Sequence, residues 1–121
     1  MADLGNSDIT TTILSKTVRD DNRKEVTATL LLAFGASKTY PTGGVPLKAG
    51  QFGFNMGVID KLTVLNDNGA GFLWEFMPAT NCLRMIYPTK TPGTTAAGLE
   101  LTGGVTAPGA DVTIQVYAEG R

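Results

Sequence analysis

Apolar side chains alternate with polar ones at every second position in three separate segments of the chain. In residues 112–119 the even positions carry Val, Ile, Val and Ala, while the odd positions carry Thr, Gln, Tyr and Glu. Residues 25–34 and 72–77 alternate in the same way. Successive side chains point to opposite faces of a β-strand, so this period predicts strands with one buried face. The β-branched Val26, Thr27 and Thr29 favour a strand over a short helix in the second segment.

Further strands and their connections follow from weaker alternation and from turn residues. We predict strands at residues 9–18, 58–66, 82–87 and, more weakly patterned, 98–102. The segments Asp20–Arg23 and Pro78–Asn81 have turn composition, and Asn66–Gly71 contains Asn68-Gly69, a dipeptide typical of type I′ turns. With these turns, residues 58–87 are predicted to form a three-stranded meander.

The strand content predicts the fold class. Residues 40–53 and 88–97 are rich in Pro, Gly and small residues and are predicted to be loops, with at most one short helix near residues 46–52. A chain of 121 residues corresponds to one domain. We therefore predict a single all-β domain, a sandwich or small barrel. Its expected core consists of the inward positions of the clearest strands: Val26, Leu30, Leu32, Phe34, Leu62, Val64, Phe72, Trp74, Phe76, Leu83, Met85, Ile114 and Val116.

The composition argues against catalysis. The chain has no histidine and one cysteine, Cys82, so a histidine base, a histidine metal ligand and an internal disulfide are excluded. Cys82 opens an apolar strand and is predicted to be inert. The pairs Ser15-Lys16 and Ser37-Lys38 would point to opposite faces of a strand. No spacing singles out two of the remaining carboxylates as a catalytic pair: Asp60, Glu75, Glu100, Asp111 and Glu119.

Cofactor, metal and nucleic-acid sites are not expected either. Asn66–Gly69 faintly resembles a calcium loop but lacks its alternating acids and closing glutamate, and a tight turn accounts for the same residues. Ten basic residues are scattered and balanced by eleven acidic ones, which argues against nucleic-acid binding. No apolar run is long enough to span a membrane as a helix, and the polar, acidic start of the chain does not look like a signal peptide.

The first eight residues are predicted to behave differently from the rest. Their only sizeable apolar side chains are those of Met1 and Leu4. We expect residues 1–8 to form a flexible N-terminal arm and residues 9–121 to form the β domain. The arm and the start of the first strand are then the expected interface with a sister subunit or a larger assembly, through Met1, Leu4, Ile9, Thr11 and Thr12.

One string in the chain is distinctive. Residues Thr39–Leu47, TYPTGGVPL, resemble a segment of the small decoration, or cement, proteins that bind the heads of tailed bacteriophages. Residues 11–14, 72–76, 81–87 and 112–120 resemble strands of the same family, whereas Gly50 stands where that family tends to a short helix. Proline fixes φ and glycine permits unusual backbone angles, so we expect a rigid structural corner built from Tyr40, Pro41, Gly43, Gly44, Pro46 and Leu47.

The resemblance implies a role without catalysis. It implies a virion component, made in the host cytoplasm, that binds the outside of an assembled capsid and stabilises it. Its partners would be the major capsid protein and further copies of itself, for which we expect a trimer. No cofactor, nucleic acid or membrane is implied.

Two other classes of function stay open. One is a different virion part, such as a tail-tube or head–tail joining protein. The other is a glycan-binding surface module that stacks a sugar on Tyr40, Tyr87, Tyr117 or Trp74. The alternation of Trp74 with Phe72 and Phe76 predicts a core position for Trp74 instead.

Overall fold

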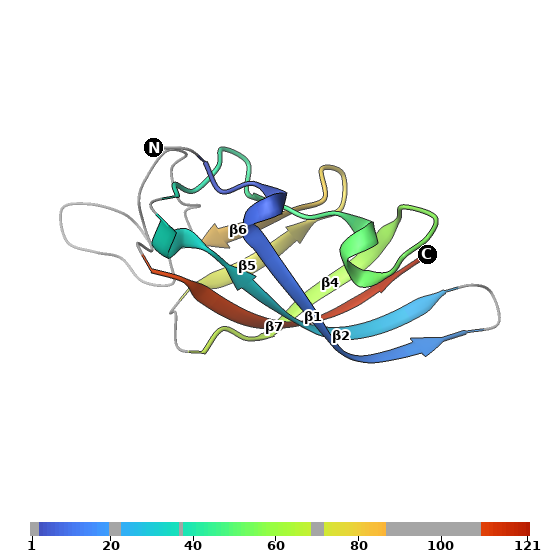
Figure 1. The fold of residues 1–121 in the computed structure, drawn as a ribbon. Helices are drawn as coiled ribbons and strands as arrows, with labels where there is room; N and C mark the ends of the chain where they lie inside the picture. Colours follow the sequence, from blue (N-terminus) through green and yellow to red (C-terminus); the bar gives the residue numbers. More distant parts are fainter. Residues whose placement is uncertain (1–2, 20–22, 37, 69–71, 87–109) are drawn as a thin grey trace.

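The strands of the computed structural model form two antiparallel sheets. The structure describes residues 3–19, 23–36, 38–68, 72–86 and 110–121. One sheet has the strand order β1-β2-β7-β4 and the other the order β3-β6-β5 (Figure 1). The strands are β1 (Ile9–Val18), β2 (Lys24–Leu32), β3 (Val45–Pro46), β4 (Ile59–Asn66), β5 (Leu73–Met77), β6 (Cys82–Ile86) and β7 (Val112–Gly120). The predicted all-β class is confirmed.

Helical structure is limited to three short 3₁₀ turns in the described residues. They are η1 (Asn6–Asp8), η2 (Phe34–Ala36) and η3 (Ala49–Phe52). The turn η3 lies where one short helix was expected, and Gly53 ends it with a left-handed φ of 79°. The two residues of β3 lie inside a stretch that was predicted to contain no strand.

Strand alternation is strongest in the middle of the larger sheet. Every second residue of β2 from Val26 to Leu32 is buried, and so is every second residue of β7 from Val112 to Gly120. Antiparallel pairing places Val26 opposite Ala118, and Leu30 opposite Ile114, so the buried residues of both strands share one face. The face packs against the smaller sheet, where Leu83 and Met85 of β6 are fully buried.

The predicted core residues of β2, β6 and β7 are buried, whereas the prediction is less complete in β4, in β5 and in the loops. Nine of the thirteen expected residues are buried, whereas Val64, Phe72, Trp74 and Phe76 are only partly buried against the core. Residues outside the predicted strands also contribute to the interior. They are Leu4, Tyr40, Val45, Leu47, Ala49, Phe52 and Phe54.

The predicted three-stranded meander is wrong in one of its two pairings. Strands β5 and β6 form the expected hairpin, with Met77 opposite Cys82. Strand β4 pairs with β7 instead, and β5 lies in the other sheet. Two hydrogen bonds of Asn68 hold the chain just after β4. Its backbone N–H donates to Asn66 Oδ1 (2.8 Å), and its side-chain Nδ2 donates to the Thr113 carbonyl (2.9 Å). Asn68 has the positive φ expected of it, 53°.

The N-terminal segment is packed on the domain, which corrects the expectation of a flexible arm for residues 3–8. Leu4 is 1% exposed, and its backbone N–H donates to the Thr39 carbonyl (2.9 Å). The Thr39 hydroxyl donates in turn to Asp3 Oδ1 (2.5 Å). Leu4 thereby belongs to the hydrophobic core of the domain. Met1, residues 20–22 of the predicted hairpin turn, the weak strand at 98–102 and the whole 88–97 loop lie outside the described residues.

Replacing Leu4 tests this packing. Leu4→Ala removes a fully buried side chain and is expected to lower the free energy of unfolding by about 2–5 kcal/mol, as measured by urea denaturation. Ser7→Ala, at an exposed position of the same segment, is the control and should change it by less than about 0.5 kcal/mol. Equal, small effects of both substitutions would show that the segment is not part of the folded domain.

Candidate functional site

The expected interface residues of the N-terminal segment are largely inaccessible. Leu4 is 1% exposed and Ile9 is 8% exposed, so neither can contact another protein without unfolding this segment. Thr11 is partly buried and its hydroxyl accepts a hydrogen bond from Gln51 Nε2 (3.0 Å). Of the expected interface residues that the structure describes, only Thr12 is exposed. An accessible interface on β1 therefore lies further along the strand, away from the N-terminal segment.

The Tyr40–Leu47 string lies in the interior and at the edge of the smaller sheet. Tyr40 is completely buried, and its hydroxyl accepts a hydrogen bond from the Met85 backbone N–H (3.2 Å). Gly44 donates its N–H to the Pro41 carbonyl (3.1 Å), which closes a turn before Val45 and Pro46 pair with β6. Leu47 is buried, and its N–H donates to the Asn81 carbonyl (2.8 Å).

Gly44 shows why this turn requires glycine. Its φ is 114°, and a Cβ at this position would lie 3.0 Å from the Leu83 carbonyl oxygen. Gly43 also has a positive φ, 90°, but a Cβ there would meet no atom within 4 Å. The string thus brings the backbone of its turn directly against β6.

The sequence-derived chemical candidates are scattered. Cys82 is partly buried and its Sγ lies 3.5 Å from the Thr80 carbonyl, to which it donates. The carboxylates have separate local partners: Asp60 pairs with Arg121, Glu75 with Arg84, and Asp111 accepts from the Gly35 N–H. Among the described residues, no three His, Cys, Asp or Glu side chains cluster as a metal site would require. Ser37 and Glu100 lie outside the described residues.

Of the remaining aromatic candidates for sugar stacking, Tyr117 is described by the structure and Tyr87 is not. Tyr117 lies on β7 and donates its hydroxyl to Glu119 Oε1 (2.9 Å). Desolvation and this contact with the Glu119 carboxylate raise the pKa of Tyr117 above its usual value. Tyr87 lies outside the described residues. Tyr40 does not form a stacking platform with Trp74, because it is buried in the core.

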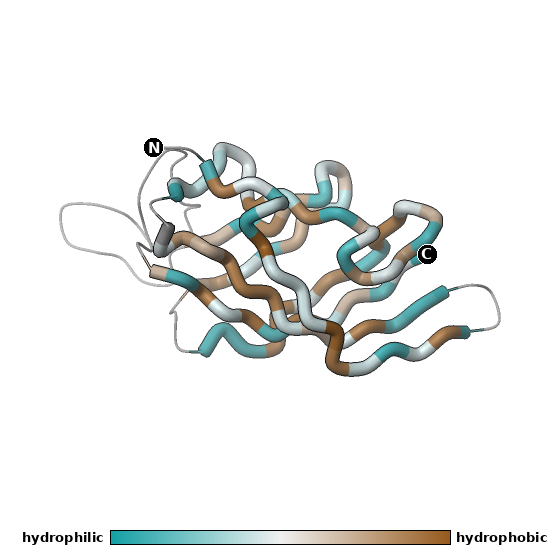
Figure 2. Tube along the Cα trace, in the orientation of Figure 1, coloured by the Kyte–Doolittle hydropathy of each residue, from teal (hydrophilic) through white to brown (hydrophobic). Residues whose placement is uncertain are grey.

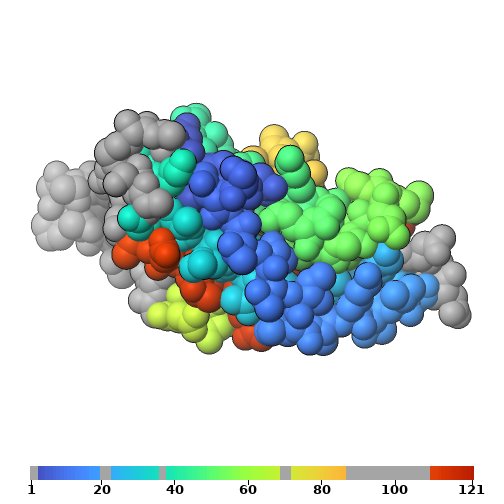
Figure 3. All heavy atoms as spheres, in the orientation of Figure 1, coloured from blue at the N-terminus to red at the C-terminus, as the bar shows by residue number. Residues whose placement is uncertain are grey.

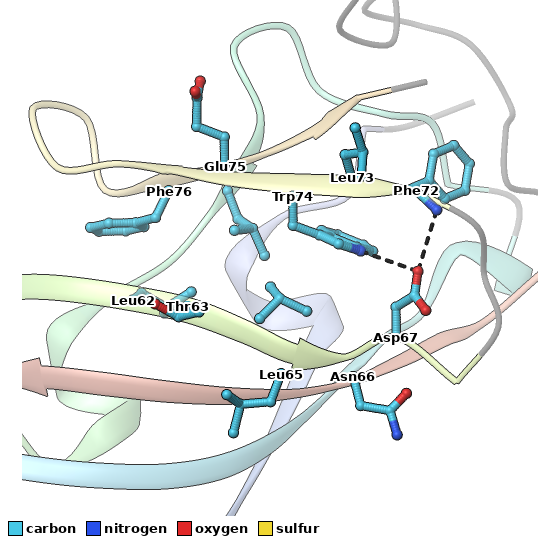
Figure 4. A pocket seen from close by; sticks show the side chains of 12 residues that line it. Leu62, Thr63, Leu65, Asn66, Asp67, Phe72, Leu73, Trp74, Glu75 and Phe76 are labelled. Atoms are coloured by element: carbon cyan, nitrogen blue, oxygen red, sulfur yellow. Dashed lines mark hydrogen bonds between the residues drawn. The ribbon is translucent and has the colours of Figure 1, made fainter. Parts of the chain in front are cut away.

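An open groove of about 660 Å³ runs between β4 and β5. Trp74 and Phe76 point from β5 toward β4, whereas Leu73 and Glu75 point away from it (Figure 4). Leu62 and Leu83 form its buried apolar floor, and Val64 lines it from β4. The rings of Phe72 and Trp74 meet edge to face, with centroids 6.3 Å apart. The period-2 pattern placed these aromatics on one face but gave no sign that the face would be half open.

Asp67 sets the polarity at one end of this groove. Its Oδ2 accepts hydrogen bonds from the Phe72 N–H (3.3 Å) and from Trp74 Nε1 (3.4 Å), as Figure 4 shows. These bonds fix the indole ring between the two sheets. Asp67 and Glu75 are the ionisable residues that line the groove, and both are acidic.

A second accessible feature is the outer edge of β1, which is an edge strand of the larger sheet. Its apolar side chains Ile13, Leu14 and Val18 are 43%, 54% and 60% exposed. The register of β1 on β2 shifts between Ile13 and Ser15, which leaves Leu14 as an extra, bulged residue. Figure 2 shows an apolar bend in β1, and in Figure 3 its atoms form uncovered outer surface.

Comparison with known proteins returns no relative. No family model matches the chain, and neither a curated protein nor a solved structure is significantly similar to it. Within the described residues, no helix has the length and apolar character needed to cross a membrane.

The Gly44 turn yields a stability prediction. Gly44→Ala adds a Cβ against the Leu83 carbonyl and forces a positive φ on a residue with a side chain, so it should destabilise the fold by about 1–3 kcal/mol. Gly50→Ala is the control, because a Cβ at Gly50 meets no atom within 4 Å and its φ is not positive. Thermal unfolding of the two variants checks the prediction. An unchanged midpoint for Gly44→Ala would show that the turn is not rigid.

Proposed function

We propose that the chain is a non-enzymatic structural protein of a bacteriophage virion that binds the outside of the assembled capsid and stabilises it. The observation that carries the proposal is the outer edge of β1, which pairs with no further strand in the described residues and exposes Ile13, Leu14 and Val18. A long apolar edge strand without cover is a site of association with other chains. The Thr39–Leu47 string, which resembles a segment of capsid decoration proteins, supports the capsid as the partner.

Association through a strand edge fits a protein that acts by contact alone. An edge strand gains main-chain hydrogen bonds when a neighbouring chain adds a strand, and its exposed side chains gain apolar contact. Small gains per copy add up when many copies bind one shell. The formal net charge of −1 keeps repulsion low among copies crowded on one surface. The major capsid protein or a sister subunit in a homo-oligomer, for which we propose a trimer, would occupy the edge.

A charge placed on the edge tests the proposal. Leu14→Lys puts an ammonium group on the bulge of β1 and should reduce occupancy on purified capsids that lack the protein by at least about tenfold. Because Leu14 is 54% exposed, the free energy of unfolding should change by less than about 0.5 kcal/mol. Met56→Lys, at a position 66% exposed and outside the strands, is the matched control and should bind as the unmodified chain does.

Two outcomes would contradict this proposal. Equal capsid occupancy for Leu14→Lys and the unmodified chain would exclude the β1 edge as the binding surface. Rings or tubes formed by the purified protein, together with no capsid binding, would favour a tail-tube or head–tail joining role.

A further inference from the structure

The groove between β4 and β5 has free strand edges on both sides. Strand β4 ends the larger sheet and β5 ends the smaller one, and in the described residues neither pairs with a further strand on its groove side. We propose that this groove binds an extended, largely apolar peptide segment of a partner protein, with a basic residue of the segment placed near Asp67. The inference goes beyond the proposed function and does not depend on it, because it concerns a different edge from that of β1.

Main-chain hydrogen bonds are the first source of binding energy. On an edge strand, alternate N–H and C=O groups point away from the neighbouring strand. An extended segment laid along β4 or β5 satisfies these groups and continues one of the sheets. A compact ligand without a peptide backbone cannot do so along the length of a strand.

Apolar side chains of the segment are the second source. Trp74, Phe76 and Val64 face the groove and are only partly buried, above a floor formed by Leu62 and Leu83. The volume of about 660 Å³ is within the range of pockets that bury a ligand of several side chains. In an extended segment every second side chain points to the same face, so alternate large apolar residues would cover these aromatic rings.

Charge selects the segment and its direction. Among the described residues, the groove is lined by two acidic side chains and by no lysine or arginine. Glu75 points out of the groove and pairs with Arg84 (2.7 Å), so the carboxylate of Asp67 dominates the potential inside. A lysine or arginine at one end of the segment lowers the electrostatic energy there, whereas an acidic residue raises it.

The same geometry argues against a sugar in this groove. Sugar recognition needs several polar side chains that converge on one ring, in addition to an aromatic face. Here Glu75 and Asn66 point away, and Asp67 is engaged with Trp74 and Phe72 (Figure 4).

The single tryptophan of the chain makes the inference directly testable, because Trp74 lies in the groove. The probe is the synthetic peptide acetyl-Lys-Thr-Val-Thr-Val-Thr-Val-amide, whose lysine and valines share one face of an extended strand, titrated against the full chain while tryptophan emission is recorded. We expect a saturable blue shift. A peptide with Glu in place of Lys should bind at least about threefold more weakly. A peptide with N-methyl groups on alternate residues, which blocks strand addition, should bind at least about tenfold more weakly.

A matched pair of variants locates the site. Val64→Lys places a charge in the groove and should weaken binding at least about tenfold, whereas Val18→Lys on the β1 edge should leave it unchanged. Circular dichroism checks that both variants fold, and the N-methylated peptide tests the inference without any variant. No emission change with the lysine peptide, equal binding of the N-methylated peptide, or an equal effect of Val18→Lys would each overturn the inference. If emission shifts with protein concentration alone, the occupant is a second copy and the inference is also overturned.

Discussion

The apolar contact between β2 and β7 on one side and the smaller sheet on the other determines the rest of the structure. Strand β7 is central, because it pairs with β2 along its full length and with β4 from Gln115 to Gly120. Its register fixes which residues of both neighbours face inward. Its last residue, Gly120, is buried where a Cβ would lie 2.2 Å from the Val58 carbonyl oxygen and 2.5 Å from the Phe54 ring. The end of the chain is thus tightly fitted to the loop before β4.

The two sides of the sandwich differ in how the two sheets are connected. On one side the Gln51 side chain connects separate elements, since its Oε1 accepts from the Lys48 N–H (2.7 Å) and from Asn6 Nδ2 (2.7 Å), and its Nε2 donates to Thr11. Asn6 also donates to the Pro46 carbonyl (3.1 Å). On the other side β4 and β5 diverge and leave the groove. These hydrogen bonds connect η1 and the start of β1 to η3 and β3 without a continuous sheet between them.

Local pattern predicted the strands but not their neighbours. The alternation in residues 112–119 or 25–34 is a property of each segment, and β7 and β2 follow it closely. Pairing depends on segments that are distant in the sequence. Strand β4 pairs with β7 although β5 is nearer in the sequence. The burial of Leu4 depends on loops more than thirty residues away, among them Thr39, which gave no signal in the first eight residues. Likewise, the alternation of Phe72, Trp74 and Phe76 predicts one face but not whether another sheet covers it.

The central claim is that, among the described residues, the two sheets leave an open groove between β4 and β5. Native-state hydrogen exchange of the free protein, followed residue by residue, tests it most directly. From Gln115 to Gly120, β7 is paired with a strand on both sides, so its amides there should exchange only through global unfolding. Alternate amides of β4, at Thr63 to Asn66, should exchange at least about a hundredfold faster, because they face the groove. Protection of all β4 amides to the level of β7 would contradict the account, because it would mean that the β4 edge is covered.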